Sequence, residues 1–551
     1  MKILILGGYG VFGGRLVRLL SDCPDLTMLI AGRNSSKAEA FCNQMSGAAK
    51  FVPLALDRAN IADALARQRP ELVVDASGPF QSYGAERYRV IEACIDAKVD
   101  YLDFADGADF VFGIDRYDDA ARAAGIFALS GVSSFPVLTA AVLREFAKDV
   151  EVRHVEGGIA PSPFAGVGLN VMRAVVGYAG APVKLLRDGE MAHGVGLGES
   201  RRYTIAVPGR VPLRNLRFSL VDVPDLQVIP PVFPGLQSIW MGAGPVPEIL
   251  HRALNLLARA RYRFRLPSLV PVAPLFYRVL NALKFGEHRG GMYVKVDGER
   301  DGMPVARSWH LLAEGDDGPY IPSMAIEAIV RKLLRGERPM PGARAATATL
   351  ELSDYAELFA GRDIHMGFRE DEFDAPLYRC ILGDAFENLP PEVRALHDSK
   401  ARRTWRGEAK VTPGTSLLAK IARRLIGAPS HTGEVPVSVT FDPTAQGEKW
   451  TRDFGGQAFR SHQLEGKGRD ARLLVERFGP VAVSLALVVE GEKLHLVPRR
   501  WSIFGCPMPR SLLPKGGSYE AERDGLFVLD VEIAVPVIGR IVAYRGTLSP
   551  A

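Results

Sequence analysis

The chain has 551 residues, of which 47% are hydrophobic and 24% are charged, a balance typical of a folded globular protein rather than a disordered one. A chain of this length is expected to form about three domains. Its net charge of +5 is too small to indicate nucleic-acid binding, so no nucleic-acid partner is expected.

The five cysteines are scattered and form no CxxC pair. This favours reduced thiols in a cytoplasmic protein and argues against zinc. No cluster of His, Cys and Asp has the spacing of metal ligands, so no metal site is expected. The chain begins with a strand-like sequence without a signal-peptide pattern, and it contains no uncharged apolar run long enough to span a bilayer.

The N-terminal sequence MKILILGGYGVFGG is an apolar strand that runs into Gly8-x-Gly10-x-x-Gly13, with a helix-like stretch after it. This is the context that a dinucleotide-binding fingerprint requires. We assign the tight turn to Gly8, the close approach to a pyrophosphate to Gly10, and the packing of helix on strand to Gly13. Val11 and Phe12 are assigned to the same site, where helix N–H groups face the phosphates. The alternative is a glycine-rich turn that binds no nucleotide.

The end of the next predicted strand indicates which nucleotide is bound. Residues 27–31 lead into Gly32-Arg33-Asn34, and no carboxylate is present there to bind the ribose 2′-hydroxyl of NAD. Arg33 can instead bind the 2′-phosphate of NADP with its planar guanidinium group. NADP is therefore predicted, with Asn34 beside Arg33, and NAD remains open. The alternative is that Arg33 only caps the following helix.

Strands and helices alternate through residues 1–130, which predicts a doubly wound parallel sheet, a Rossmann domain. Ligands bind at the carboxyl ends of such strands. Further cofactor contacts are therefore assigned to residues that follow predicted strands: Asp57, Ala76, Ser77, Gly78, Pro79 and Phe80.

Hydride transfer requires orientation of the substrate and often a proton donor. Tyr83 and Asp106 are the catalytic candidates, and Asp103 and Ser134 are further side chains near the strand ends. Tyr83 has the alternative role of an aromatic lid on the cofactor. One of the two aspartates has the alternative role of binding loop N–H groups.

Residues 131–365 are predicted to form an α+β domain that carries the substrate pocket and the contact of a homodimer. His193, His310 and Tyr320 are candidate pocket residues, although a single histidine is more often structural. Residues 251–265, HRALNLLARARYRFR, are predicted to form a basic amphipathic helix. Its arginines, from Arg252 to Arg265, indicate either a peripheral contact with a membrane surface or a solvated face packed on its own domain.

Residues 370–551 are predicted to form an antiparallel β-rich, half-barrel-like domain, because apolar residues alternate with small or polar ones at 435–441, 481–489 and 527–535. Small residues between large ones suit a concave wall. An apolar ligand cavity is one interpretation, and a packed core with a protein-contact role is the other.

The segments GGYGVFGGRL, LIAGRN, VVDASGPFQSYG, ACIDAKVDYLDFADG and GVSSFPVLTAAVL together resemble the saccharopine-dehydrogenase-like oxidoreductases. The sequence from residue 377 onward is similar to a domain of unknown function that is fused behind such reductases in bacteria. The resemblance implies that the first domain binds NADP or NAD, at Gly8, Gly10, Gly13, Arg33, Asn34 and the loop 76–80.

These observations predict an NADP-dependent oxidoreductase. It would transfer a hydride to or from a carbonyl, imine or enoyl group of a small-molecule, lipid-like substrate. One alternative is a nucleotide-binding scaffold without turnover, whose C-terminal domain binds a lipid or a protein. Another is saccharopine dehydrogenase itself. We expect a cytoplasmic protein. The alternative, which the basic helix implies, is a cytoplasmic protein that associates with a membrane surface.

Overall fold

The computed structural model describes residues 1–166, 168–213, 215–245, 247–371 and 375–551, in two compact units. The N-terminal unit comprises Met1–Arg202, Arg217–Arg307 and Leu312–His365, and the barrel unit comprises Tyr203–Leu216, Ser308–Leu311 and Met366–Ala551. The three predicted domain ranges, 1–130, 131–365 and 370–551, remain a prediction.

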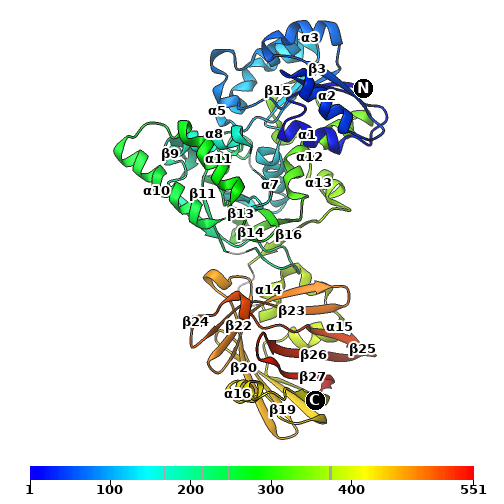
Figure 1. The fold of residues 1–551 in the computed structure, drawn as a ribbon, viewed down its shortest axis with the longest axis vertical. Helices are drawn as coiled ribbons and strands as arrows, with labels where there is room; N and C mark the ends of the chain where they lie inside the picture. The colour runs from blue at the N-terminus through cyan, green and yellow to red at the C-terminus, as the bar shows by residue number, and fades with distance from the viewer. Residues whose placement is uncertain (167, 214, 246, 372–374) are drawn as a thin grey trace. The chain divides into compact units, whose positions relative to one another are not determined.

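The first sheet of the N-terminal unit is parallel throughout and has the order β15-β6-β5-β4-β1-β2-β3. Its central strands are apolar at nearly every position because helices cover both faces. The prediction of a doubly wound Rossmann sheet is confirmed (Figure 1). The strands are β1 (Lys2–Leu6), β2 (Thr27–Gly32), β3 (Lys50–Ala55), β4 (Leu72–Asp75), β5 (Asp100–Asp103), β6 (Phe127–Ser130) and β15 (Gly342–Ala345).

The edge strand β15 joins the sheet from far along the chain and lies outside residues 1–130. Its register on β6 is set by pairing and by Asp118, which accepts a hydrogen bond from the backbone N–H of Ala343 at 2.9 Å. The helices around this sheet are α1 (Val11–Leu19), α2 (Ser35–Gln44), α3 (Ile61–Gln68), α4 (Arg89–Ala97), α5 (Ala108–Phe112) and α6 (Asp118–Ala124).

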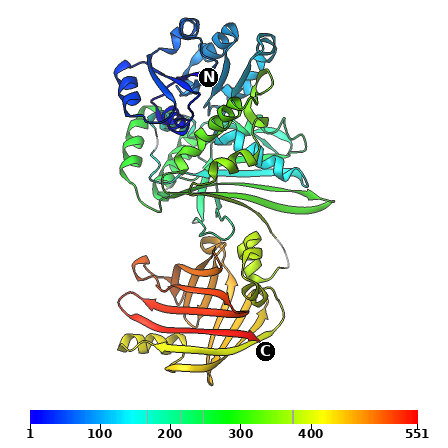
Figure 2. The ribbon, with the colours of Figure 1, turned by 90° about the vertical axis from the view of Figure 1, so that its right-hand side faces the viewer.

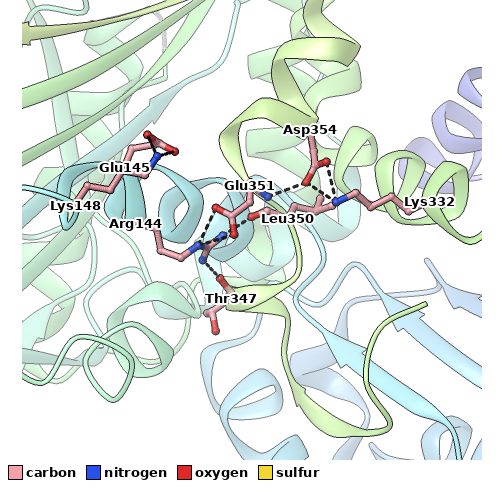
Figure 3. A network of polar contacts seen from close by, with 8 residues as sticks. All are labelled: Arg144, Glu145, Lys148, Lys332, Thr347, Leu350, Glu351 and Asp354. Atoms are coloured by element: carbon pink, nitrogen blue, oxygen red, sulfur yellow. Dashed lines mark hydrogen bonds and ion pairs between the residues drawn. The ribbon is translucent and has the colours of Figure 1, made fainter. Parts of the chain in front are cut away.

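A polar network fixes the chain after β15 (Figure 3). Arg144 donates two hydrogen bonds to Glu351, at 3.1 and 3.2 Å, and others to the carbonyl groups of Thr347 and Leu350. Asp354 accepts from the backbone N–H of Glu351 at 2.8 Å. These contacts connect α7 (Thr139–Phe146) with the start of α13 (Leu352–Phe359), and so hold the returning segment beside the Rossmann sheet.

The second sheet is mixed and has the order β10-β11-β12-β7-β13-β14-β16. Its strands are β7 (Glu151–Ala160), β10 (Ser200–Tyr203), β11 (Leu216–Leu220), β12 (Ser238–Ala243), β13 (Arg289–Arg300), β14 (Met303–Glu314) and β16 (Ile364–Glu370). β8 (Pro182–Arg187) and β9 (Glu190–Val195) form a separate hairpin. The remaining helices are α8 (Leu169–Tyr178), α9 (Asp225–Val228), α10 (Glu248–Phe264), α11 (Ala273–Ala282) and α12 (Ile321–Leu334). None of the helices in the described ranges combines the length and hydropathy needed to cross a bilayer.

The barrel unit contains an antiparallel sheet that closes on itself, because β22 pairs with β21 on one side and with β23 on the other. The predicted antiparallel β-rich domain is confirmed, and the curvature continues beyond half a barrel to full closure (Figure 2). Around the barrel the strands are β17 (Arg403–Pro413), β18 (Gly433–Thr444), β19 (Gly447–Phe454), β20 (Gln457–Glu465), β21 (Leu474–Phe478), β22 (Val481–Glu490), β23 (Lys493–Ile503), β25 (Ser518–Arg523), β26 (Leu526–Val535) and β27 (Gly539–Pro550), and the short β24 (Cys506–Pro507) extends β23.

Three helices accompany the barrel. α14 (Leu377–Leu382) packs on β20 and α15 (Pro391–His397) packs on β25 and β26, whereas α16 (Leu417–Ile426) packs on β27. Alternation of side chains explains the interior: in β22, Val483, Leu485 and Leu487 are buried and belong to the barrel core.

Candidate functional site

A cleft of about 700 Å³ follows the carboxyl ends of the parallel strands, where ligands of such sheets bind. Most residues predicted to bind the cofactor line it, and both catalytic candidates do. These residues are Gly10, Val11, Phe12, Arg33, Asp57, Ala76, Ser77, Gly78, Pro79, Phe80, Tyr83 and Asp106. The far wall comes from the segment that begins α8, including Asn170 and Arg173. Gly8, Gly13 and Asn34 support the cleft from behind and do not line it.

The glycine loop leaves no room for side chains where it faces α1. Gly7 has φ +72°, and the Cβ of an alanine there would overlap the carbonyl group of Ala76. A Cβ on Gly10 or Gly13 would lie within 3.0 Å of the Gly7 carbonyl oxygen. The backbone N–H of Gly10 donates to that oxygen at 2.8 Å. The loop therefore passes close to the start of α1, a cradle of the kind that accepts a pyrophosphate.

Gly8 has a different role from the one we assigned. The positive φ of the turn belongs to Gly7, one residue earlier. Gly8 instead packs against β2, because a Cβ there would lie 3.0 Å from the Ile5 carbonyl oxygen and from Ile30 Cγ2. Because Gly7 and Gly8 are adjacent in the sequence, the sequence alone did not indicate which of them adopts the positive φ of the turn.

Arg33 is exposed at the end of β2 and lines the cleft. Within the described part of the chain its side chain makes no hydrogen bond or ion pair. The helix cap that was the alternative role belongs to its neighbour, since the Asn34 side chain accepts from the backbone N–H of Lys37 at 2.9 Å. Tyr9, which sequence reasoning missed, lies against Gly32, and its hydroxyl accepts from the backbone N–H of Asn34 at 3.1 Å.

Tyr83 belongs to a partly buried chain of hydrogen bonds that ends at buried Asp75. Its hydroxyl lies 2.7 Å from Ser77 Oγ, which donates to Asp75 Oδ1 at 2.5 Å. The Arg58 guanidinium group lies over the Tyr83 ring, 4.0 Å from its centroid, and 3.9 Å from Asp75 Oδ2. Burial raises the pKa of Tyr83 to about 12, with the Asp75 carboxylate adding to the shift. Tyr83 therefore keeps its proton at neutral pH.

Asp75 is the main site residue that the sequence analysis missed. Its side chain is fully buried, burial raises its pKa, and Oδ2 has no hydrogen-bond partner among the described residues. One feature of the sequence could have indicated this role: Asp75 ends an apolar strand and lies two residues before the hydroxyl side chain of Ser77. Asp57, in contrast, caps the turn after β3 by accepting from the backbone N–H of Ala59 at 2.9 Å.

The other aspartates have distinct environments. Asp106 is exposed to the cleft and accepts from Gln81 Nε2 at 2.9 Å. Asp103 is the aspartate that binds loop N–H groups: its Oδ1 accepts from the backbone of Ala105 at 3.0 Å and of Gly131 at 2.7 Å. Burial raises the pKa of Asp103 to about 7. It connects two strand ends and does not line the cleft.

The remaining candidates lie outside the cleft. Ser134 is buried, and the neighbouring Ser133 lines the cleft instead. His193 is exposed on β9. His310 is buried in the barrel unit, where Nδ1 accepts from the backbone N–H of Ala206 at 3.1 Å. Tyr320 is half-buried just before α12. Among the described residues, no three His, Cys, Asp or Glu side chains are placed to hold a metal ion.

The arginines of α10 do not share one face. Arg252, Arg259 and Arg263 are exposed on one side, but Arg261 donates to the carbonyl oxygens of Gly177 and Ala179 at 2.9 and 2.5 Å. Arg265 ends the helix in the left-handed conformation. A membrane contact of this helix stays a prediction, as does the homodimer.

Comparison with protein families agrees with this geometry. Residues 3–129 match the family described as "Saccharopine dehydrogenase NADP binding domain". The first part of the chain is therefore a dinucleotide-binding domain that matches the saccharopine dehydrogenase model. Residues 389–548 match the "Domain of unknown function (DUF4166)". The predictions of an NAD(P)-dependent oxidoreductase and of a nicotinamide dinucleotide cofactor are confirmed at this level.

No curated protein matches the chain. Solved structures that match the chain include a probable dehydrogenase from Thermotoga maritima (10% identity, 64% of this chain and 92% of that one, TM-score 0.31). An amine dehydrogenase from Mycobacterium smegmatis also matches (10% identity, 63% and 95%, TM-score 0.32). A third is the WlbA dehydrogenase from Thermus thermophilus, solved with NAD and α-ketoglutarate (12% identity, 64% and 96%, TM-score 0.28). The assignment of the saccharopine-dehydrogenase-type NADP-binding domain therefore rests on the family match.

Proposed function

We propose that the protein is an NADP-dependent oxidoreductase that transfers a hydride to or from a carbonyl, imine or enoyl group of a lipid-like small molecule. The observation that carries this proposal is the arrangement of one cleft. It joins a glycine cradle, an exposed arginine at the end of β2 and a protonated tyrosine. Bound in the cleft, the nicotinamide would supply or accept the hydride.

Arg33 supports the choice of NADP. A cofactor phosphate on the ribose needs a cationic partner, and an NAD-specific site would place a carboxylate near the same strand end. The Arg33 guanidinium group is exposed in the cleft, and no carboxylate holds it within the described residues. It is therefore free to form a bidentate contact with a phosphate.

Tyr83 supports turnover over a scaffold role. Ser77 gives its only hydroxyl hydrogen to Asp75, so the Tyr83 hydroxyl donates to Ser77 Oγ and is held at a fixed position in the cleft wall. In the proposed reaction, the Tyr83 O–H turns from Ser77 to the substrate and gives its proton there, which leaves a phenolate on Tyr83. Ser77 then turns from Asp75 to donate to the phenol oxygen. Ser77 and Asp75 are positioning residues in this scheme, and Tyr83 is the general acid.

The experiment is a titration of the full chain with NADPH and NADH, followed by nicotinamide fluorescence. Arg33→Ala should weaken NADPH binding about 10-fold or more, consistent with the loss of a charge-assisted contact, and leave NADH binding nearly unchanged. Arg67→Ala, an exposed arginine of α3 outside the cleft, is the matched control. Failure of the wild type to bind either nucleotide would overturn the proposal.

A substrate screen then follows NADPH oxidation with long-chain carbonyl, imine and enoyl compounds, and with saccharopine in the reverse direction. Turnover of saccharopine alone would identify the protein as saccharopine dehydrogenase itself. Tight NADPH binding without turnover of any class would favour the scaffold alternative.

A further inference from the structure

The closed barrel contains a cavity that the oxidoreductase chemistry does not use. Its volume is about 230 Å³, and most of its walls are aliphatic or aromatic. Side chains around an unfilled apolar space lose dispersion contacts on one side, so an apolar occupant is favoured there. The lining includes Val483, Leu485, Leu496, Leu529, Val531 and Ile533.

A hydrogen-bonded network around Glu476 lies inside the barrel and contributes to the cavity lining. Glu476 Oε1 accepts from Arg452 at 3.0 Å, from Ser461 at 2.7 Å and from Gln463 at 3.1 Å. This network satisfies its own donors and acceptors in the middle of the barrel, so the cavity offers little to a polar head group. A hydrocarbon chain suits the interior, and the polar end of such a ligand belongs at the entrance.

α16 lies over one end of the cavity. Its inner side contributes Ala422 and Ile426 to the lining. Glycines flank the helix on both sides: Gly414 precedes its Ser416 cap, and Gly427 ends it with φ +71°. Within the barrel unit the helix is therefore a short cover with a glycine at each end, and the backbone N–H of Gly414 donates to the Ile541 carbonyl oxygen at 2.9 Å.

The outer side of α16 is apolar although it faces solvent. Leu417 is 73% exposed, Leu418 is 51% exposed and Ile421 is 58% exposed. Lys420 and Arg424 are also exposed, and the helix sequence LLAKIARRLI contains no acidic residue. An apolar stripe beside basic residues is typical of helices that lie in the interface of an anionic membrane.

The turns beside α16 continue this surface. Ser416 Oγ donates to the Ile538 carbonyl oxygen at 3.2 Å, which places the β26–β27 turn next to the helix. Val537 in that turn is 86% exposed. A Cβ on Gly479 would lie 3.7 Å from the Leu425 carbonyl oxygen, and Phe504, 80% exposed, donates its backbone N–H to Pro480. Figure 2 shows α16 and the β26–β27 turn at the same end of the barrel.

We propose that the barrel binds a single-chain amphiphile of the fatty-acid class, which it takes from an anionic membrane surface through the end covered by α16. The chain occupies the cavity and the anionic head lies at its mouth. Lys515 is exposed and also lines the cavity, and in this proposal its ammonium group pairs with the anionic head. This assigns a ligand-binding role to the domain of unknown function, independently of the oxidoreductase reaction.

Ligand binding is tested with the fluorescent fatty acid cis-parinaric acid and the full chain. Saturable binding is expected. Val531→Trp should fill the cavity and weaken binding at least 10-fold, whereas Val528→Trp, on the same strand but not in the lining, should leave it unchanged. Leu485→Met, which preserves volume, shows whether a core change alone alters binding. Absence of saturable binding, or equal losses in both tryptophan variants, would overturn the proposal.

Membrane contact is tested by sedimentation with vesicles of phosphatidylcholine and phosphatidylglycerol. Ile421→Glu and Arg424→Glu should each lower vesicle binding several-fold and slow the transfer of cis-parinaric acid from vesicles. Leu526→Glu, another exposed apolar residue of the barrel unit, is the control. Fatty-acid binding without any vesicle binding would overturn the membrane route, and vesicle binding that only Leu526→Glu reduces would place the contact elsewhere.

Discussion

Tyr83 is the residue whose surroundings separate a catalytic role from a packing role. An aromatic lid needs only its ring, and phenylalanine would replace it. The hydroxyl, however, is held at 2.7 Å from Ser77 in a chain that ends at buried Asp75. Such a network is costly to bury, and a ring that only covers the cofactor would not require the hydroxyl.

Tyr83→Phe is expected to lower kcat by about 100-fold, within the usual range for loss of a general acid, while NADPH affinity stays within about 2-fold. Steady-state kinetics together with the fluorescence titration measure both quantities. Phe80→Leu, which alters an aromatic neighbour of Tyr83 without removing a proton donor, is the comparison. An unchanged kcat in Tyr83→Phe would assign Tyr83 to the lid role.

Asp103 makes stability depend on pH. Its pKa is raised to about 7 by burial, so the folded state binds the proton more tightly than the unfolded state. The contribution is complete below the unfolded pKa near 3.8 and is lost as the pH rises to about 7. Asp103→Asn keeps an acceptor oxygen for Ala105 and Gly131 but cannot ionise.

We therefore expect the variant to lose less stability than the wild type between about pH 4 and about pH 7. Urea unfolding at several pH values measures this difference. Asp103→Ala, which leaves the loop donors unpaired, should be less stable by about 1–3 kcal/mol at every pH. Parallel pH curves for wild type and Asp103→Asn would contradict the argument.

At the scale of elements, the start of α1 shows how position reverses a general rule. Replacing glycine by alanine inside a helix normally stabilises by about 1 kcal/mol. At Gly13, however, the new Cβ would overlap the Gly7 carbonyl oxygen, which is backbone and cannot rotate away. At the adjacent Gly14 it would meet the Phe41 ring at 3.3 Å, and that side chain can shift.

Gly13→Ala is accordingly expected to lower the free energy of unfolding by about 1–3 kcal/mol, through the strain of overpacking, and to weaken NADPH binding. Gly14→Ala should be near neutral for both. Thermal unfolding and nucleotide titration of the two variants check this. Equal stability of the two variants would mean that the loop moves freely away from α1.

The same element scale shows what the sequence could predict. The apolar strand before the glycines and the alternation after it were sufficient for the Rossmann sheet. The strand β15 was not predictable, because its four residues, GARA, carry no strand pattern and gain their structure by pairing with β6. Tyr9 was missed for a related reason: it contacts Gly32 and Asn34, which are distant in sequence, and periodicity contains no information on such contacts.

At the scale of the whole molecule, alternation in β22 and β26 predicted inward apolar side chains but not closure. Closure depends on the pairing of β22 with β23 at one side of the sheet and of β17 with β27 at another, and register between distant strands is set in three dimensions. The prediction of a curved antiparallel sheet was therefore correct, but the sheet closes completely where only half a barrel was predicted. The cavity follows from closure, since only a closed wall surrounds a space.

Because the chain folds into two compact units, each with its own core and its own proposed ligand site, a ligand should stabilise only the unit that binds it. Binding at 100 times Kd adds about 2.7 kcal/mol to the stability of the folded state. In calorimetry of the full chain we expect two transitions. NADPH should raise the midpoint of one by a few degrees, and cis-parinaric acid the midpoint of the other. Arg33→Ala should abolish only the first shift and Val531→Trp only the second. If either ligand raised both midpoints equally, the two sites would be energetically coupled and the units could not be treated as independent.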